Sequence, residues 1–309
     1  MRLEIDPKVD YAFKKLFGSE GNRDILIDLL HAVLQPKPGR LITDLTLLNP
    51  FSDQDALSDK LAILDIKARD QGMRQFHIEM QMRWEWFAPS RAVYYLAKFH
   101  QQQLQEGDYY QTLRPTISIW FVNEPVVEQV ASHHLTFRLW DEHHGVLLTD
   151  DLVIHVLQLP RFTKGLDELV TPLDRWCWFL RHGASIDPDH IPGPLDVPAI
   201  RRAVEVLWML KQSDIERERY EARVKAERDR VSSLLAAEQR GEERGEKRGE
   251  ERGEKRGEER ATQRELIERV QIFQDLLKRP RTAAETLLAL PLGDLRGLAN
   301  QLEAELRRQ

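Results

Sequence analysis

Two short stretches decide the fold, LAILDIK at residues 61–67 and QFHIEMQ at residues 75–81. Apolar and polar residues alternate through both, which is typical of a β-strand that buries one face. Between them, residues 69–73 (RDQGM) have the composition of a turn, in which Gly72 is free to adopt a positive φ. The two stretches therefore predict strands that pair as a β-hairpin.

The polar residues of this hairpin include two carboxylates that could meet. Alternate residues of a strand share a face, so Asp65 and Lys67 lie together, as do His77, Glu79 and Gln81. Two carboxylates a few ångströms apart repel unless a divalent cation lies between them, and Mg²⁺ suits such oxygen ligands. The alternative is a hairpin with an ordinary solvated face, which the spacing alone favours.

Helices and further strands flank the hairpin. In residues 6–18 apolar residues recur at helical spacing, with Asp6 as N-cap, Pro7 as first helical position and Gly18 as the stop. Similar patterns predict helices at 22–34 and 90–104, a buried strand at 115–122, a strand-rich region at 130–160 and helices within 172–212. The prediction is an α/β core.

The composition sets limits on function. The 309 residues are 41% hydrophobic, enough for one sizeable domain with appendages. A net charge of −6 neither supports nor excludes a nuclease, which needs carboxylates at its site and basic residues around it. The single cysteine, Cys177, excludes an internal disulfide and a cysteine metal site. With no signal-peptide layout and no membrane-spanning apolar run, we expect a cytoplasmic protein without a membrane partner.

After Ser213 the sequence becomes rich in Glu, Arg, Lys and Ala, so we expect a domain at 1–212 and a charged helical spacer at 213–264. The tetrapeptide Gly-Glu-(Glu/Lys)-Arg occurs five times in residues 241–260. Opposite charges at i,i+3 and i,i+4 favour a helix, whereas each glycine costs about 0.8 to 1 kcal/mol. A mobile spacer is favoured over a coiled coil, because no apolar seam is present.

The last segment, residues 265–309, predicts a C-terminal helical module. Leu266, Val270 and Phe273 share a face of its first helix, and Thr282 is expected to open the second. The module packs either on itself or on another subunit, so a homodimer through the C-terminal helical segments is one expectation.

Three blocks resemble a known family: LDIKA at 64–68, IEMQ at 78–81, and DPKVDYAFKKLFG at 6–18. In this order they resemble the Rpn family of recombination-promoting nucleases, also called transposases, within the PD-(D/E)xK nuclease superfamily. The resemblance covers residues 3–125 closely and extends more loosely to residue 210. It implies a restriction-endonuclease-like core, a mixed sheet flanked by helices, with a charged helical extension and a small helical module. It also implies a DNA endonuclease that uses Mg²⁺ or Mn²⁺ in recombination or transposition.

The resemblance also assigns roles to residues. It implies that Asp65 is the metal-binding aspartate, that Glu79 is the acidic member of the second half-motif, and that the Met80 carbonyl completes the metal ligands. Asp10 on the first helix would be a further carboxylate near the metal; its alternative is an ordinary carboxylate on a helix surface.

One position departs from the superfamily pattern, because Gln81 stands where lysine is usual. Glutamine can orient a water molecule but supplies no positive charge. Lys67 lies on the predicted face of Asp65, so its ammonium group could take the place of the missing lysine. A catalytically weak nuclease-fold protein that binds DNA or assembles through its charged segments is therefore the competing interpretation, and metal-dependent cleavage would separate the two.

Other candidate sites are weaker. The adjacent pairs His133–His134 and His143–His144 are poor joint metal ligands, because neighbouring side chains point apart. An aromatic and basic cluster follows the hairpin; we expect its aromatic residues in the core rather than stacked on bases, with Arg83 or Arg91 available to a phosphate. This cluster comprises Arg83, Trp84, Trp86, Phe87, Arg91, Tyr94 and Tyr95.

Overall fold

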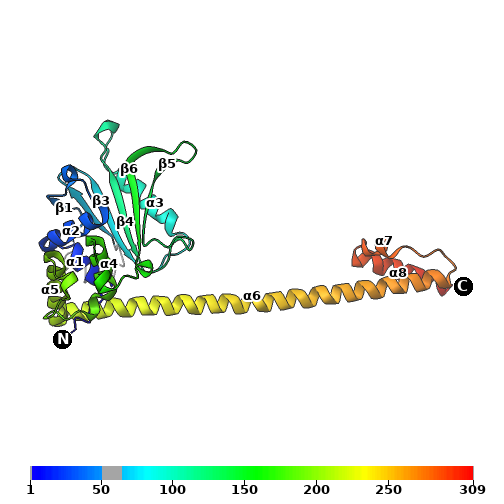
Figure 1. Cartoon of the computed structure of the whole chain (residues 1–309). Helices are drawn as coiled ribbons and strands as arrows, with labels where there is room; N and C mark the ends of the chain where they lie inside the picture. The colour runs from blue at the N-terminus through cyan, green and yellow to red at the C-terminus, as the bar shows by residue number, and fades with distance from the viewer. Residues whose placement is uncertain (1, 51–64, 309) are drawn as a thin grey trace. The chain divides into compact units, whose positions relative to one another are not determined.

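A computed structural model describes residues 2–50 and 65–308 of the chain (Figure 1). It divides into two compact units, Met1–Glu227 and Arg228–Gln309. Among the described residues, no helix is both long and apolar enough to cross a membrane.

The first unit is built on a six-stranded mixed sheet in the order β1-β2-β3-β4-β6-β5. β4 runs parallel to its neighbours β3 and β6, whereas the other neighbouring strands are antiparallel. All seven residues of β4 are buried, as expected for a central strand covered on both faces. The strands are β1 (Leu45–Leu47), β2 (Ile66–Asp70), β3 (Gln75–Gln81), β4 (Thr116–Val122), β5 (His134–Asp141) and β6 (Val146–Gln158).

The predicted hairpin is present as β2 and β3, which pair antiparallel with Ile66 opposite Ile78. β2 begins at Ile66, and the predicted strand residues 61–64 lie outside the described residues. The turn differs from the prediction, because Met73 and not Gly72 adopts the positive φ, of 64°. The reason is Asp70, whose Oδ1 accepts hydrogen bonds from the backbone N–H groups of Gly72 and Arg74 and holds the turn in this shape.

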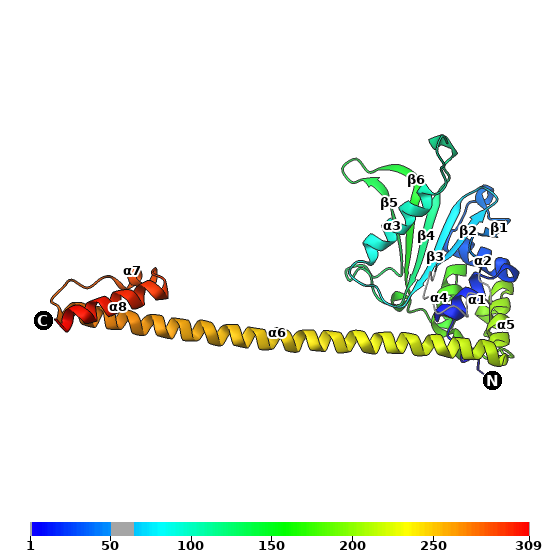
Figure 2. The ribbon, with the colours of Figure 1, turned by 180° about the vertical axis from the view of Figure 1, so that it is seen from behind.

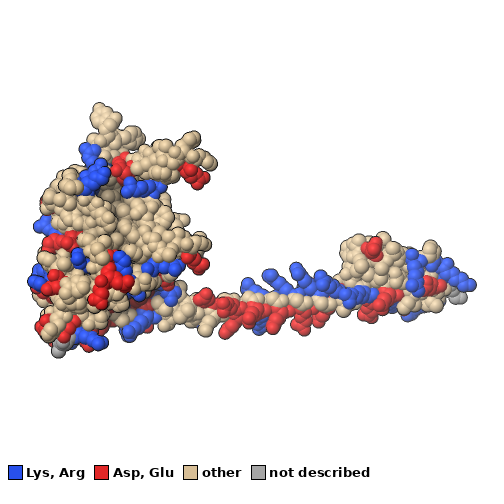
Figure 3. Space-filling model, in the orientation of Figure 1, with Lys and Arg blue, Asp and Glu red and all other residues tan. Residues whose placement is uncertain are grey.

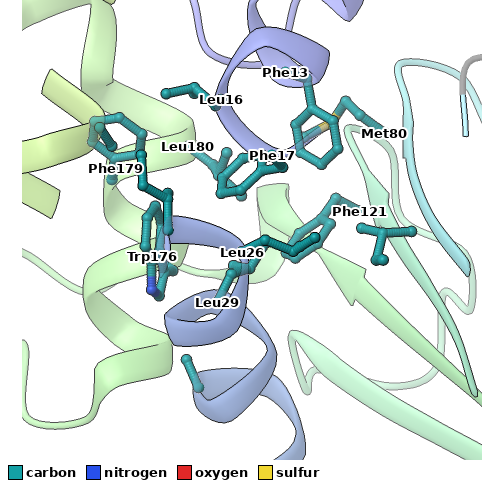
Figure 4. Packing of buried hydrophobic residues seen from close by; sticks show 14 of the residues in the cluster. Phe13, Leu16, Phe17, Leu26, Leu29, Met80, Phe121, Trp176, Phe179 and Leu180 are labelled. Atoms are coloured by element: carbon teal, nitrogen blue, oxygen red, sulfur yellow. The ribbon is translucent and has the colours of Figure 1, made fainter. Parts of the chain in front are cut away.

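Four helices cover one face of the sheet and form the main core with it (Figure 4). Phe13 of the first helix packs against Phe17 with tilted rings whose centroids are 4.8 Å apart, and Phe17 contacts Trp176 edge to face at 5.5 Å. Phe13 also contacts Phe121 of β4 at 6.0 Å, which ties the helices to the sheet. These helices are α1 (Asp10–Phe17), α2 (Arg23–Leu34), α4 (Pro172–His182) and α5 (Pro198–Gln212).

The start of α1 corrects the prediction of Asp6 as its N-cap and Pro7 as its first residue. The helix begins at Asp10, since Asp6 instead closes a turn by accepting a hydrogen bond from the Lys8 N–H, 2.9 Å away. The Asp6 N–H donates to the hydroxyl of Tyr220. The helix ends before Gly18, as predicted.

Among the described residues, the helix α3 (Ala88–Gln101) covers the other face of the sheet (Figure 2). Its Ala92 packs with Trp120 and Val122 of β4 and Val156 of β6. These strand residues alternate with residues of the main core, so the sheet is buried on both sides. The mixed sheet between helices confirms the expected PD-(D/E)xK-like α/β class, including the helix near 90–104 and the strand at 115–122.

The N-terminus of α4 carries a buried carboxylate, which leads to a stability prediction. Asp174 is 2% exposed and accepts hydrogen bonds from the Lys164 ammonium and the N–H groups of Val170 and Thr171. Burial opposes ionisation, but these donors outweigh it and hold the pKa of Asp174 below 3.8, its ordinary value. A carboxyl with a lowered folded-state pKa stabilises the fold above the unfolded pKa and loses that contribution as pH falls through the folded value.

We expect Asp174→Asn to lower the free energy of unfolding by about 1 to 3 kcal/mol at neutral pH, because donors lose a charged acceptor. The difference from the wild type should shrink in acid, below the ordinary carboxyl pKa. Urea unfolding at several pH values measures both effects. Asp167→Asn, at an exposed carboxylate in the short 3-10 helix Leu166–Glu168 that precedes α4, is the matched control, and an equal loss in the two variants would contradict the role of Asp174.

The long helix α6 (Asp214–Leu276) runs through all five tetrapeptide repeats. A repeat of four residues nearly matches the 3.6 residues of a helical turn, so like charges follow one another along the helix. Figure 3 shows Lys and Arg gathered on one side of this part of α6, and Asp and Glu on the other. The first unit extends to Glu227 and includes the start of α6, where Tyr220 joins the main core, whereas the sequence places the boundary at residue 212.

The second unit has a small core of its own. The end of α6 packs on α7 (Ala284–Leu288) and α8 (Leu292–Leu306), so the module packs on itself, one of the two expected arrangements. Thr282 does not open a helix, because its N–H and hydroxyl bond the side chain of Gln274 on α6. The residues of this core are Leu266, Ile267, Val270, Leu287, Leu295, Ala299 and Leu302.

Candidate active site

The hairpin presents a polar row on the face of the sheet that α3 covers. Ile66, Ala68, Phe76, Ile78 and Met80 point into the main core on the opposite face. Because side chains alternate along a strand, the residues between them face α3. This row contains the predicted site residues Asp65, Lys67, Glu79 and Gln81, together with His77.

His77 links the two carboxylates at the centre of the row. Its Nε2 lies 3.1 Å from Asp65 Oδ2 and 3.8 Å from Glu79 Oε2. An ionised carboxylate can only accept a hydrogen bond, so Nε2 carries the proton that is donated to Asp65. On its other side, Nδ1 lies 2.8 Å from the hydroxyl of Ser118, which also accepts from Trp120 Nε1. His77 is 1% exposed, and these contacts hold its ring in place.

Sequence reasoning placed His77 on this face but gave it no role. The missing information was the parallel pairing of β3 with β4, which sets His77 opposite Ser118. The sequence does contain a signal for His77. It stands two residues before Glu79, so its imidazole lies on the strand face that carries both carboxylates.

Two cations flank the carboxylates from different elements. Lys67 Nζ lies 3.4 Å from Asp65 Oδ2, on the hairpin itself. Arg91 reaches across from α3; its Nη2 lies 3.1 Å from Glu79 Oε1 and donates to Gln81 Oε1 at 2.7 Å. The structure therefore places a guanidinium group beside Gln81, where the superfamily pattern has a lysine ammonium group.

The two carboxyl groups have opposite pKa shifts. Burial raises the pKa of Asp65, but the hydrogen bond from His77 and the charges of His77 and Lys67 outweigh it, so the net pKa is lowered. Burial also raises the pKa of Glu79, and here it prevails over His77 and Arg91, with repulsion from Asp65 adding to the rise. Asp65 is therefore the more readily ionised of the pair.

The donor set fits a magnesium-type cation. Asp65 Oδ1 is buried and has no hydrogen-bond donor among the described residues, so one hard oxygen is left for a ligand. The Glu79 carboxylate stands on the paired strand beside it. Mg²⁺ is commonly bound through one or two carboxylates, with waters and substrate phosphates completing the shell. The described residues contain no group of three or more His, Cys, Asp or Glu arranged to hold a metal.

The two remaining predicted ligands are Asp10 and the Met80 carbonyl. Asp10 lies in the first turn of α1; burial raises its pKa against the charges of Lys14 and Arg223. The charge of Lys14 also lowers the pKa of Glu79, so Lys14 acts on both Asp10 and Glu79. The side chain of Met80 is buried in the main core, which leaves only its carbonyl for the site.

The aromatic cluster after the hairpin is a correction, because most of it is not core. Of its aromatic residues, Trp84 packs against Trp120 of the core, with ring centroids 5.8 Å apart. Trp86, Phe87, Tyr94 and Tyr95 are 91%, 39%, 59% and 41% exposed.

The histidine pairs point apart, as their spacing implies. His133 contacts Phe162, whereas His134 Nε2 lies 2.9 Å from His155 Nδ1. His144 Nδ1 lies 2.8 Å from Asp141 Oδ2 on the exposed β5–β6 hairpin.

One of three comparisons with known proteins found a match. The model of a family described as PD-(D/E)XK nuclease family transposase matches residues 7–237, which include both carboxylates, Arg91 and the whole sheet. Neither the curated proteins nor the solved structures gave a match. The matched range covers most of the chain and confirms the resemblance that the three sequence blocks carry. The chain therefore belongs to the PD-(D/E)XK nuclease family transposases.

Proposed function

We propose that this protein is a metal-dependent endonuclease that hydrolyses phosphodiester bonds of DNA. The family indicates a nuclease-like function linked to transposition, with DNA as substrate. The observation that carries the proposal is the buried Asp65 Oδ1, which has no donor within residues 2–50 and 65–308 and lies beside the Glu79 carboxylate. Leaving a charged oxygen buried and unpaired is costly, and a divalent cation would satisfy it.

In this proposal Asp65 and Glu79, with the Met80 carbonyl, hold Mg²⁺, for which Mn²⁺ can substitute. The cation supplies a Lewis acid that polarises the phosphodiester and acidifies a water molecule. His77 orients the Asp65 carboxylate through its Nε2–H, and Ser118 fixes the His77 ring. Asp10 is a further proposed metal-binding carboxylate, supported by Lys14, whose charge lowers the pKa of both Asp10 and Glu79.

The hydrogen bond from Arg91 limits which atoms of Gln81 can contact a substrate or a water molecule. Arg91 has only donors, so the group it contacts on Gln81 must be the carbonyl oxygen. The Gln81 amide N–H groups then remain to donate to a phosphate oxygen or to a water lone pair. The positive charge that a lysine would bring comes from Arg91 or from Lys67, both of which lie at the carboxylates.

Incubation of supercoiled plasmid with the purified protein tests the proposal. We expect nicked and linear products in Mg²⁺ or Mn²⁺ and none in EDTA. Mg²⁺ should also raise the stability of the native protein, by about 2.7 kcal/mol at a hundred times its dissociation constant, because it binds only the native state. A well-folded protein that neither cleaves the plasmid nor gains stability from the cation would instead be a nuclease-fold protein that binds DNA or assembles.

A further inference from the structure

The outer face of α3 carries an aromatic stripe that no part of the proposed mechanism uses. The inner face of α3 is buried through Ala88, Ala92, Leu96 and Phe99. On the outer side Phe87, Tyr94, Tyr95 and Lys98 are exposed and follow one another at spacings of seven, one and three residues. Trp86 stands at the start of this side. We define the aromatic stripe as Trp86, Phe87, Tyr94 and Tyr95.

The rings of the stripe are exposed, yet they form two pairs of contacting rings. Trp86 and Phe87 meet edge to face with centroids 5.7 Å apart, and Tyr94 and Tyr95 do so at 5.6 Å. Trp86 is 91% exposed, which is unusual for the largest apolar side chain of a soluble domain. Rings that are held together on the surface offer flat apolar faces to a ligand.

The stripe adjoins the candidate active site and carries positive charge. The ring of Tyr95 lies 6.2 Å from that of His77, the residue that bridges both carboxylates. Lys98 Nζ lies 5.8 Å from the centre of the Tyr94 ring. From Phe87 to Lys98 the helix rises about 16 Å. A nucleic-acid strand that reached Asp65 would therefore pass rings for its bases and a cation for its phosphates.

From this arrangement we infer that the aromatic stripe binds single-stranded DNA by stacking on unpaired bases next to the cleavage site. The inference rests on the proposed function, because it names the form of the DNA which that site receives. Base stacking on aromatic side chains tolerates any sequence and needs bases whose faces are free. In an intact duplex those faces are covered by neighbouring base pairs, so a duplex could use only the cations.

Binding without metal tests the stripe independently of cleavage. The wild-type protein in EDTA is titrated into three labelled probes of equal length: oligothymidylate, an abasic strand and a duplex. We expect oligothymidylate to bind about five- to a hundredfold more tightly than the abasic strand, the range that stacking of one base produces. Trp86→Ala and Tyr94→Ala should each remove most of this preference while binding to the abasic strand stays the same.

Two variants serve as controls. Trp86→Phe keeps an aromatic face and should retain most of the preference. Trp140→Ala removes a tryptophan that is 58% exposed on β5, away from α3, and should bind all three probes as the wild type does. All of these side chains are exposed, so the variants are expected to fold, which thermal unfolding checks.

The outcomes separate the stripe from the proposed function. Equal binding to oligothymidylate and the abasic strand, tighter binding to the duplex, or no effect of Trp86→Ala would overturn the stacking surface. Base-dependent binding by a protein that cleaves no plasmid would overturn the nuclease alone. Cleavage without base-dependent binding would overturn the stripe alone.

Discussion

Asp65→Asn should abolish metal-dependent cleavage of DNA, lowering its rate by about a thousandfold or more. Loss of a ligand to the cation removes several kcal/mol of charge stabilisation, and 4 kcal/mol corresponds to about a thousandfold in rate. The substitution keeps the size of the side chain, so His77 Nε2 can still donate to the remaining oxygen. Glu79→Gln should have an effect of the same order, because it removes the second carboxylate.

Plasmid cleavage in Mg²⁺ measures these losses. Glu142→Gln, at an exposed carboxylate of the β5–β6 hairpin, is the matched control and should cleave at the wild-type rate. Stabilisation by Mg²⁺ is a second readout, which should vanish in Asp65→Asn although the variant remains folded. Cleavage by Asp65→Asn at the wild-type rate would show that the metal is held elsewhere.

Arg91→Ala should lower the cleavage rate by about a hundredfold, the loss seen when one preorganised donor is removed from a charged transition state. The guanidinium group touches both Glu79 and Gln81, so its removal leaves Glu79 buried without its partner. The charge of Arg91 lowers the pKa of Glu79, so in its absence that pKa should rise further. We therefore expect the acidic limb of the pH–rate profile to move to higher pH.

Lys67→Ala and Gln81→Ala complete this comparison. If Lys67 replaces the usual lysine, its loss should lower the rate as much as that of Arg91, and unimpaired cleavage by Lys67→Ala would assign the charge to Arg91. Arg91→Lys should restore part of the rate, since an ammonium group keeps the charge but cannot contact both residues with a planar fork. An unchanged rate and pH profile in Arg91→Ala would contradict its role.

Much of the site could be predicted from local sequence, because the hairpin is local. Alternation over residues 66–70 and 75–81 places Asp65 and Glu79 on one face whatever the rest of the chain does. The details of its turn could not be predicted, since Asp70 satisfies two backbone N–H groups and moves the positive φ from Gly72 to Met73. The start of α1 could not be predicted for a similar reason. Asp6 forms hydrogen bonds with Lys8 and Tyr220, so the helix begins at Asp10 and not at Pro7.

The aromatic cluster illustrates the limit of reasoning from composition. Trp84 and Trp86 are two residues apart and chemically alike, yet one packs on Trp120 and the other is 91% exposed. Hydrophobicity alone favoured burial for both. Whether Trp84 or Trp86 packs on the sheet depends on where α3 begins. The start of α3 is in turn decided by how the helix packs on the sheet.

The sequence by itself determined the paired carboxylates, the α/β class and the family of this protein. The reason is that the strand period and the short motifs depend only on residues that lie close together in the chain. Only the tertiary structure decided that Arg91 of α3 reaches Gln81, that Ser118 of β4 holds His77, and that Tyr95 adjoins the site. These contacts join separate elements across a parallel sheet and a helix layer. Their positions follow from burying both faces of the sheet, a condition on the whole domain that no local pattern contains.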